Sequence, residues 1–175
     1  MCNRKGPCRT GNESATPSSE YVGPGDFCRV FETAMPNLHL LALLLTAKAD
    51  KAEQCFVAGL EDCLQGNPIF KEWSLSWAKR AIIKRAIAVI SPAIGREQPV
   101  IREADQMGKS DARLSAVMEL APFERFVFVM SVLEGYSDQE CCVLLDCTRR
   151  DIAEARVQAV QQVAEPEQKS IDLRA

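Results

Sequence analysis

The chain has 175 residues, of which 47% are hydrophobic and 26% charged, and its formal net charge at neutral pH is -3. This composition is that of a globular protein and excludes a fibrous or wholly disordered chain. A slightly acidic protein does not attract nucleic acid through its overall field, so affinity for DNA would have to come from local clusters of basic residues.

Residues 1–25 are rich in Gly, Pro, Ser, Thr and Asn and nearly free of large apolar groups. Such a segment buries too little apolar surface to offset the entropy of ordering, so we predict a disordered tail there. The segment has no apolar core typical of a signal peptide, and the longest apolar run, Leu38–Leu45, is too short to cross a bilayer. We therefore expect a soluble protein.

Apolar residues recur at helical spacing after Asp26, and this predicts a first helical domain over residues 26–91. Pro36 interrupts its first helix, which resumes as the buried segment Leu38–Thr46. A second helix is expected from Asp50, as its N-cap, to about Leu64. A third is expected over about Lys71–Ile90, where Ser91-Pro92 stops it.

Residues 92–110 mix Pro, Gly and charge without periodicity and predict a linker. A second helical domain follows over residues 111–165, with Pro122 in the first turn of one of its helices, and residues 166–175 are expected to be a flexible tail. No segment alternates apolar and polar residues as a strand would. The predicted fold class is all-α.

The segment Phe123–Val163 predicts an apolar helix that leads into a helix-turn-helix. Ser137–Glu140 and Thr148–Asp151 each match a capping box, and the three residues Asp146-Cys147-Thr148 suit the turn between the two helices. Apolar residues at helical spacing would let these helices bury one another: Val143, Leu144, Ile152, Ala155 and Ala159. Such a unit usually docks its second helix on DNA.

This order of elements resembles the extracytoplasmic-function sigma factors of bacterial RNA polymerase, over about Phe27 to Val163. Pro36-Asn37-Leu38 with Leu44-Leu45-Thr46 and Asp50–Glu53 is similar to the family's P-x-L…L-T-G…A-E-D run. Leu120–Arg125, Glu134–Ser137 and Leu144–Thr148 are similar to its L-P-x-x-x-R, E-G-x-S and L-L-G-C-S motifs. The resemblance implies a region 2-like three-helix domain and a region 4-like four-helix domain.

In such proteins the first domain binds core RNA polymerase and captures the melted minus-ten strand, and the last binds the minus-thirty-five duplex. The helix that begins at Asp50 is then the polymerase contact, with Glu53, Gln54, Phe56, Val57 and Leu60 as its candidate residues. For Phe56 and Leu60 taken singly, a place in the hydrophobic core is the alternative. An anti-sigma factor is a further implied partner, and the location implied is the bacterial cytoplasm.

Two groups of residues are candidate DNA contacts. The stretch from Lys71 to Arg102 has a local excess of five positive charges, and four of them could line one side of the third helix, with Trp73 or Trp77 stacking a base: Lys79, Arg80, Lys84 and Arg85. The alternative is a solvated basic face with both tryptophans in the core. On the last helix the candidate donors are Thr148, Arg149, Arg150, Arg156 and Gln158.

We expect no cofactor, no metal site and no enzymatic activity. Cys141, Cys142 and Cys147 form no Cys-x-x-Cys pair, His39 is the single histidine, and no glycine-rich phosphate loop is present. Cysteines inside apolar helical patterns are expected to be free thiols in a reducing cytoplasm.

The leading hypothesis is a sigma-like transcription initiation and regulatory protein that binds core RNA polymerase and promoter DNA. Two alternatives remain open. The residues Gln54, Val57 and Ala58 replace those that in the family usually face the polymerase clamp. The segment Ser137–Val163 contains five acidic and three basic residues. Both observations favour a sigma-like protein-interaction module without promoter activity. The other alternative is a stand-alone dimeric helix-turn-helix regulator.

Overall fold

A computed structural model of the protein describes residues 20–67, 69–93 and 112–172. These residues form helices, and the one β-type pairing among them is an isolated bridge between Tyr21 and Phe70. The all-α class is therefore confirmed for the described part of the chain. Residues 1–19 of the predicted tail (1–25) and residues 94–110 of the predicted linker (92–110) lie outside the described residues.

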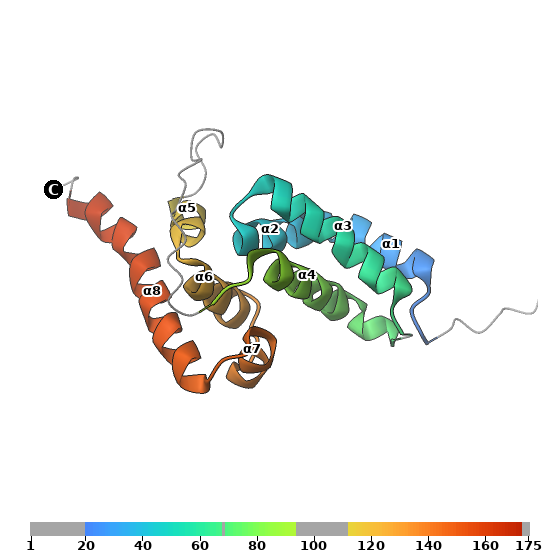
Figure 1. The fold of residues 1–175 in the computed structure, drawn as a ribbon. Helices are drawn as coiled ribbons and strands as arrows, with labels where there is room; N and C mark the ends of the chain where they lie inside the picture. The colour runs from blue at the N-terminus through green and yellow to red at the C-terminus, as the bar shows by residue number, and fades with distance from the viewer. Residues whose placement is uncertain (1–19, 68, 94–111, 173–175) are drawn as a thin grey trace, which may run out of the picture.

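Two groups of helices lie side by side (Figure 1). The first consists of α1 (Pro24–Thr33), α2 (Met35–Thr46), α3 (Ala49–Gln65), a 3-10 turn (Lys71–Trp73) and α4 (Ser74–Ile90). The second consists of α5 (Ala112–Glu119), α6 (Pro122–Phe128), a π-helical turn (Val129–Leu133), α7 (Asp138–Leu145) and α8 (Arg149–Asp172).

The first group packs around the apolar helix α2, whose Leu38, Ala42 and Leu45 are fully buried. The expected interruption is present, because α1 ends at Thr33 and α2 begins at Met35, with Pro36 in the first turn of α2, where a missing backbone N–H costs nothing. Helices α3 and α4 approach closely at Gly59, because a Cβ there would lie 2.8 Å from Cγ1 of Ile82.

The start of α3 differs from the prediction. Lys48 is the N-cap residue and Asp50 lies in the first turn without capping it. The turn is held instead by Thr46, whose hydroxyl donates to the carbonyls of Ala42 (2.8 Å) and Lys48 (3.1 Å). Asp50 still suits the positive end of the helix dipole.

In the second group, α6 begins at Pro122, as predicted, and the last helix is the long α8. Helix α8 continues to Asp172, through residues predicted to be a flexible tail. At the other end, the chain is already ordered before residue 26, because α1 begins at Pro24 with Gly23 as its N-cap.

The two groups contact each other through α2, which packs against α5 and α6. Buried residues of both groups belong to one hydrophobic cluster, with Leu45 and Ile82 on one side and Phe126 and Met130 on the other. The halves predicted as separate domains are therefore in direct contact, and their boundaries stay a prediction.

Candidate functional site

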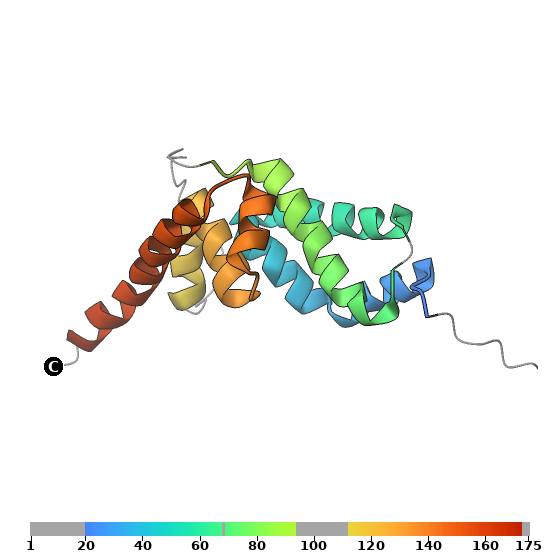
Figure 2. The same ribbon diagram turned by 90° about the horizontal axis from the view of Figure 1, so that it is seen from below.

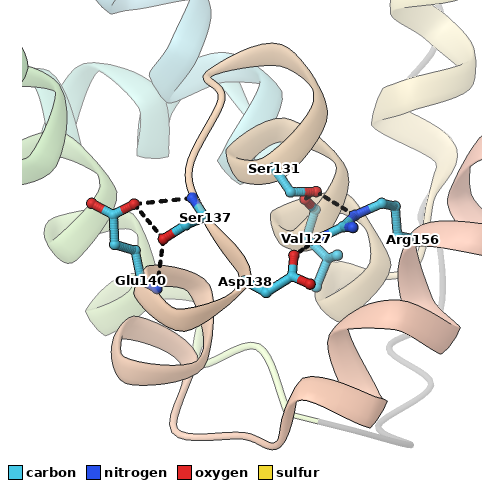
Figure 3. Close-up of polar contacts among 6 residues, drawn as sticks. All are labelled: Val127, Ser131, Ser137, Asp138, Glu140 and Arg156. Carbon is cyan, nitrogen blue, oxygen red and sulfur yellow. Dashed lines mark hydrogen bonds and ion pairs between the residues drawn. The ribbon is translucent and has the colours of Figure 1, made fainter.

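The helix-turn-helix corner is built by the two capping boxes predicted from the sequence. The backbone N–H of Ser137 donates to Oε2 of Glu140 (2.9 Å), and the Glu140 N–H donates to the Ser137 hydroxyl (3.3 Å); Figure 3 shows this box. Thr148 and Asp151 repeat the reciprocal pair at 2.9 and 3.3 Å. The Ser137 and Thr148 hydroxyls also donate to these carboxylates (2.7 and 2.6 Å), and the hydroxyl bonds, followed by the backbone N–H bonds, lower the pKa of both the Glu140 and the Asp151 carboxyl groups. Each box satisfies two amides that a helix start leaves without a partner.

The turn between α7 and α8 has the predicted length. Asp146 adopts the left-handed conformation (φ 51°, ψ 54°), and the N–H of Cys147 donates to the carbonyl of Cys142 at 3.2 Å. This is the Schellman arrangement that commonly ends a helix. Glycine is the usual residue at the left-handed position, and Asp tolerates it better than most.

The packing within the corner corrects one predicted contact. Ile152, Ala155 and Ala159 of α8 are buried as expected, but Val143 of α7 is 69% exposed. Helix α7 buries Cys141 and Leu145, which are four residues apart and share a face, so a residue midway between them faces away. Leu144 is half-buried.

Arg156 joins α8 to the rest of the corner. Its Nε donates to the Ser131 hydroxyl at 3.1 Å, and its Nη2 forms an ion pair with Asp138 at the start of α7 (Figure 3). A guanidinium that is held in this way between two other elements positions α8. It is not presented to a DNA backbone.

Three of the other predicted donors, Thr148, Arg149 and Arg150, are also engaged, though at the surface. Nη2 of Arg149 donates to Oε1 of Gln139 (2.7 Å), and Nε of Arg150 pairs with Glu154 (2.7 Å). The Thr148 hydroxyl is used by the capping box. Gln158 is exposed. The Arg150 pair is a weak surface interaction, because its side chain is 85% exposed.

The exposed part of α8 beyond Asp151 is mixed, because apolar residues lie there among the exposed polar residues Glu154, Gln158, Gln161 and Gln162. Val157 is 57% exposed and Val160 46% exposed, and Ala153 and Ala164 are exposed as well. Between Asp151 and Ala164 the helix carries a single cation, Arg156, which is turned to Asp138. Beyond its first turn, the helix therefore offers a mixture of apolar and polar area, and its one cation is paired.

The predicted basic row on α4 is divided between neighbours. Lys79 pairs with Glu134 of the second helical group at 2.6 Å, whereas Arg85 is paired with Asp62 of α3. At about 100° per residue these two side chains point to different sides of the helix. Among the described residues, Arg80 and Lys84 have no carboxylate within ion-pair distance, and Arg80 is half-buried. The structure does not bring the four cations together.

The tryptophans are at the surface, so their predicted alternative place in the core is wrong. Trp73 is 56% exposed and Trp77 39%. Trp73 packs edge-on against Phe70 (ring centroids 5.3 Å apart), and Phe70 stacks on Tyr21 (4.9 Å). The three rings form an exposed aromatic cluster where the chain enters α1 and α4.

The predicted polymerase contacts on α3 fall into two classes. Glu53, Gln54 and Val57 are exposed, and Val57 shows 50% of its surface. Phe56 and Leu60 are partly buried against the core. The rings of Phe56 and Phe31 pack edge to face, with their centroids 5.2 Å apart. The exposed three are the part of this set that a partner can reach.

Arg125 is a structural residue that the sequence analysis placed only within a motif. It is 6% exposed and donates to the carbonyls of Leu45 (3.1 Å), Met118 (3.2 Å) and Leu120 (3.0 Å). It thus serves carbonyls at the C-terminal ends of both α2 and α5, where helices leave acceptors unpaired. Burial lowers its pKa to about 10. An arginine among the apolar residues Phe123, Phe126 and Val127 of α6 is the signal that indicates this role.

The cysteines of the described residues are free thiols, as expected. Cys55, Cys63 and Cys141 are buried, and burial raises the pKa of the Cys63 and Cys141 thiols to about 11. Within the described ranges, no three His, Cys, Asp or Glu residues are grouped as a metal site would require.

Comparison with known proteins assigns no family: no family model, no curated protein and no solved structure matches the chain. Within residues 20–67, 69–93 and 112–172, no helix has both the length and the hydrophobicity needed to span a bilayer.

Proposed function

We propose that this protein is a sigma-like transcription regulatory protein that works through protein contacts, with core RNA polymerase as its main partner. The observation that carries this proposal is the part of α8 beyond its first turn, where Val157 and Val160 are exposed and the single cation, Arg156, is paired with Asp138. A helix that reads duplex DNA would place donors and cations there. Exposed apolar residues favour a protein surface instead.

The charges of the corner support the same choice. Five acidic and three basic residues lie between Ser137 and Val163, and two of the three arginines are paired with carboxylates. Proteins bind DNA by neutralising phosphates with cations, and a net negative surface opposes that. The corner has kept a helix-turn-helix shape without the surface charge that DNA requires.

The polymerase contact is assigned to α3, following the resemblance of this segment to the sigma factors. Glu53, Gln54 and Val57 are exposed and lie within two turns of one helix. An anti-sigma factor that covers the same surface is the second partner expected from the resemblance.

Capture of purified bacterial core RNA polymerase by the full chain tests the proposal. We expect the chain to retain the polymerase, and we expect Val57→Glu to reduce capture at least about tenfold, because a buried unpaired carboxylate is costly at an interface. Val143→Glu is the matched control, since this valine is also exposed but lies on α7. Absence of capture, or equal loss in both variants, would contradict the proposal.

A second candidate function is promoter binding by the helix-turn-helix, as in a complete sigma factor. It is favoured by the first turn of α8, where Arg149 and Arg150 are exposed at the positive end of the helix dipole. Fluorescence anisotropy with duplex DNA across a salt series tests it. Arg149→Ala with Arg150→Ala should then weaken binding and reduce the salt slope, whereas Arg29→Ala should not. A stand-alone dimeric regulator would in addition protect two half-sites of a palindrome in footprinting.

A further inference from the structure

Cys142 and Cys147 lie on the two sides of the turn between α7 and α8. The N–H of Cys147 donates to the carbonyl of Cys142 at 3.2 Å, across the left-handed residue Asp146. In a Schellman turn, the two residues joined by this hydrogen bond frequently have their side chains in contact as well. This turn has a cysteine at both positions, and it therefore places two thiols side by side.

The two thiols are in contact with each other and within reach of solvent. Burial is the main cause that raises the pKa of the Cys147 thiol to about 11, and the neighbouring Cys142 adds to the shift, in part through a hydrogen bond between the two thiols. The preceding residue, Cys141, is fully buried in the core, whereas Cys142 and Cys147 are each half-buried. The turn lies at one side of the molecule and faces the viewer in Figure 2.

This arrangement fits the requirements of a disulfide. Two cysteines can be bridged when their Cα atoms are about 4.4–6.8 Å apart and their side chains point towards each other. Residues that share a direct backbone hydrogen bond and a contact between their thiols suit this geometry. We propose that Cys142 and Cys147 are a redox-active thiol pair that closes to a disulfide across the α7–α8 turn.

The oxidant for this step is a small-molecule disulfide, such as oxidised glutathione. One cysteine thiolate attacks a sulfur of the small disulfide, whose S–S bond breaks, and the first small thiol leaves with the proton that the attacking thiol lost. The other cysteine then attacks the mixed disulfide at the protein sulfur, forms the bond between Cys142 and Cys147, and releases the second small thiol with its own proton. Two protein thiols are oxidised, and one small disulfide is reduced to two thiols.

The surroundings of the pair determine when it closes. A disulfide near the surface is reduced more easily than a buried structural one, so the pair is open in a reducing compartment and closes under oxidising conditions. A thiol with a raised pKa contains little thiolate at neutral pH, so closure is slow. The extent of closure is therefore a matter of redox equilibrium, and the pair is not a fast peroxide sensor.

Incubation of the full chain to equilibrium in glutathione buffers of graded redox potential tests the inference. Free thiols are then blocked, and the chain is cleaved before its aspartate residues, which separates residues 138–145 from residues 146–150. The disulfide leaves these two peptides joined. We expect the joined peptides to increase as the buffer becomes more oxidising, and to separate again with excess dithiothreitol.

Single variants identify the two partners. Cys142→Ser and Cys147→Ser should each abolish the joined peptides, and circular dichroism establishes that each variant is folded. Cys28→Ser is the matched control, because it removes an exposed thiol on α1 and should leave the joined peptides unchanged. Fragmentation of the joined peptides should assign the bond to Cys142 and not to Cys141.

A comparison with the unfolded chain tests the role of the turn. The equilibrium constant for closure should be at least about tenfold larger in the folded chain than in concentrated urea, because the folded turn already holds the two thiols together. Three results overturn the inference: no joined peptides at any potential, a bond between other cysteines, or a constant no larger in the folded chain. None of these measurements involves polymerase or DNA, so their outcome is independent of the proposed function.

Discussion

Arg125 connects the two groups of helices without a carboxylate partner. Its guanidinium donates to three backbone carbonyls, one on α2 and two at the end of α5, and burial lowers its pKa to about 10. The cost of removing this charge from water is offset by hydrogen bonds to carbonyls that would otherwise be buried without a donor. One side chain thus completes two helix ends and an interface together.

Replacing Arg125 with Met should lower the free energy of unfolding by about 1–3 kcal/mol, because the carbonyls of Leu45, Met118 and Leu120 lose their donor. Urea denaturation followed by circular dichroism measures this change. Arg29→Met is the control, since the Arg29 side chain is 76% exposed and should change stability by no more than about 0.5 kcal/mol. Equal effects of the two substitutions would show that Arg125 has no special structural role.

The α7–α8 corner owes its shape to local hydrogen bonds more than to burial. Helix α7 has only eight residues and buries two of them, Cys141 and Leu145, so it has little tertiary packing of its own to rely on. Short helices are marginal in isolation, and the capping boxes at Ser137 and Thr148 make up part of the difference.

Ser137→Ala and Thr148→Ala should each reduce stability by about 1 kcal/mol, because each removes the acceptor for an amide at the start of a helix. Thermal unfolding of the two variants provides the measurement. Ser76→Ala offers a matched comparison on the surface of α4, where alanine is at least as good a helix former. If the cap variants unfold like Ser76→Ala, the capping boxes contribute nothing to stability.

The whole chain should unfold as one unit, although its sequence divides into two helical segments. Helix α2 contacts both groups, and the Lys79–Glu134 ion pair and the Arg125 hydrogen bonds cross between them. Contacts of this kind make the stability of one half depend on the other.

Ile82→Ala tests this coupling, because it creates a cavity in the first group and should cost about 2–5 kcal/mol. Hydrogen exchange should then speed up in α8 as well as in α4. Val57→Ala, on the surface of α3, serves as the control. Faster exchange confined to α1–α4 would mean that the halves unfold independently.

Local signals were sufficient for much of the corner. The capping boxes at Ser137 and Thr148, the turn at Asp146 and the start of α6 at Pro122 depend on interactions between residues close in sequence, and all were predicted correctly. The same holds for the all-α class, which follows from helical periodicity. Asp50 was an exception, because a neighbouring side chain, Thr46, formed the turn instead.

The surroundings of the charged and aromatic side chains depended on residues far away in the chain. Glu134 lies 55 positions from Lys79, and Leu45 lies 80 from Arg125, and no periodicity reveals such pairs. In the same way, the sequence pattern left the surface and the core equally open as places for the two tryptophans. The sequence alone determined where α6, α7 and α8 begin and where the α7–α8 turn lies, because those bonds are local. Which arginines remain available to a partner, and which side of α8 is left uncovered, followed from tertiary packing, because burial and ion pairing depend on what other elements bring alongside.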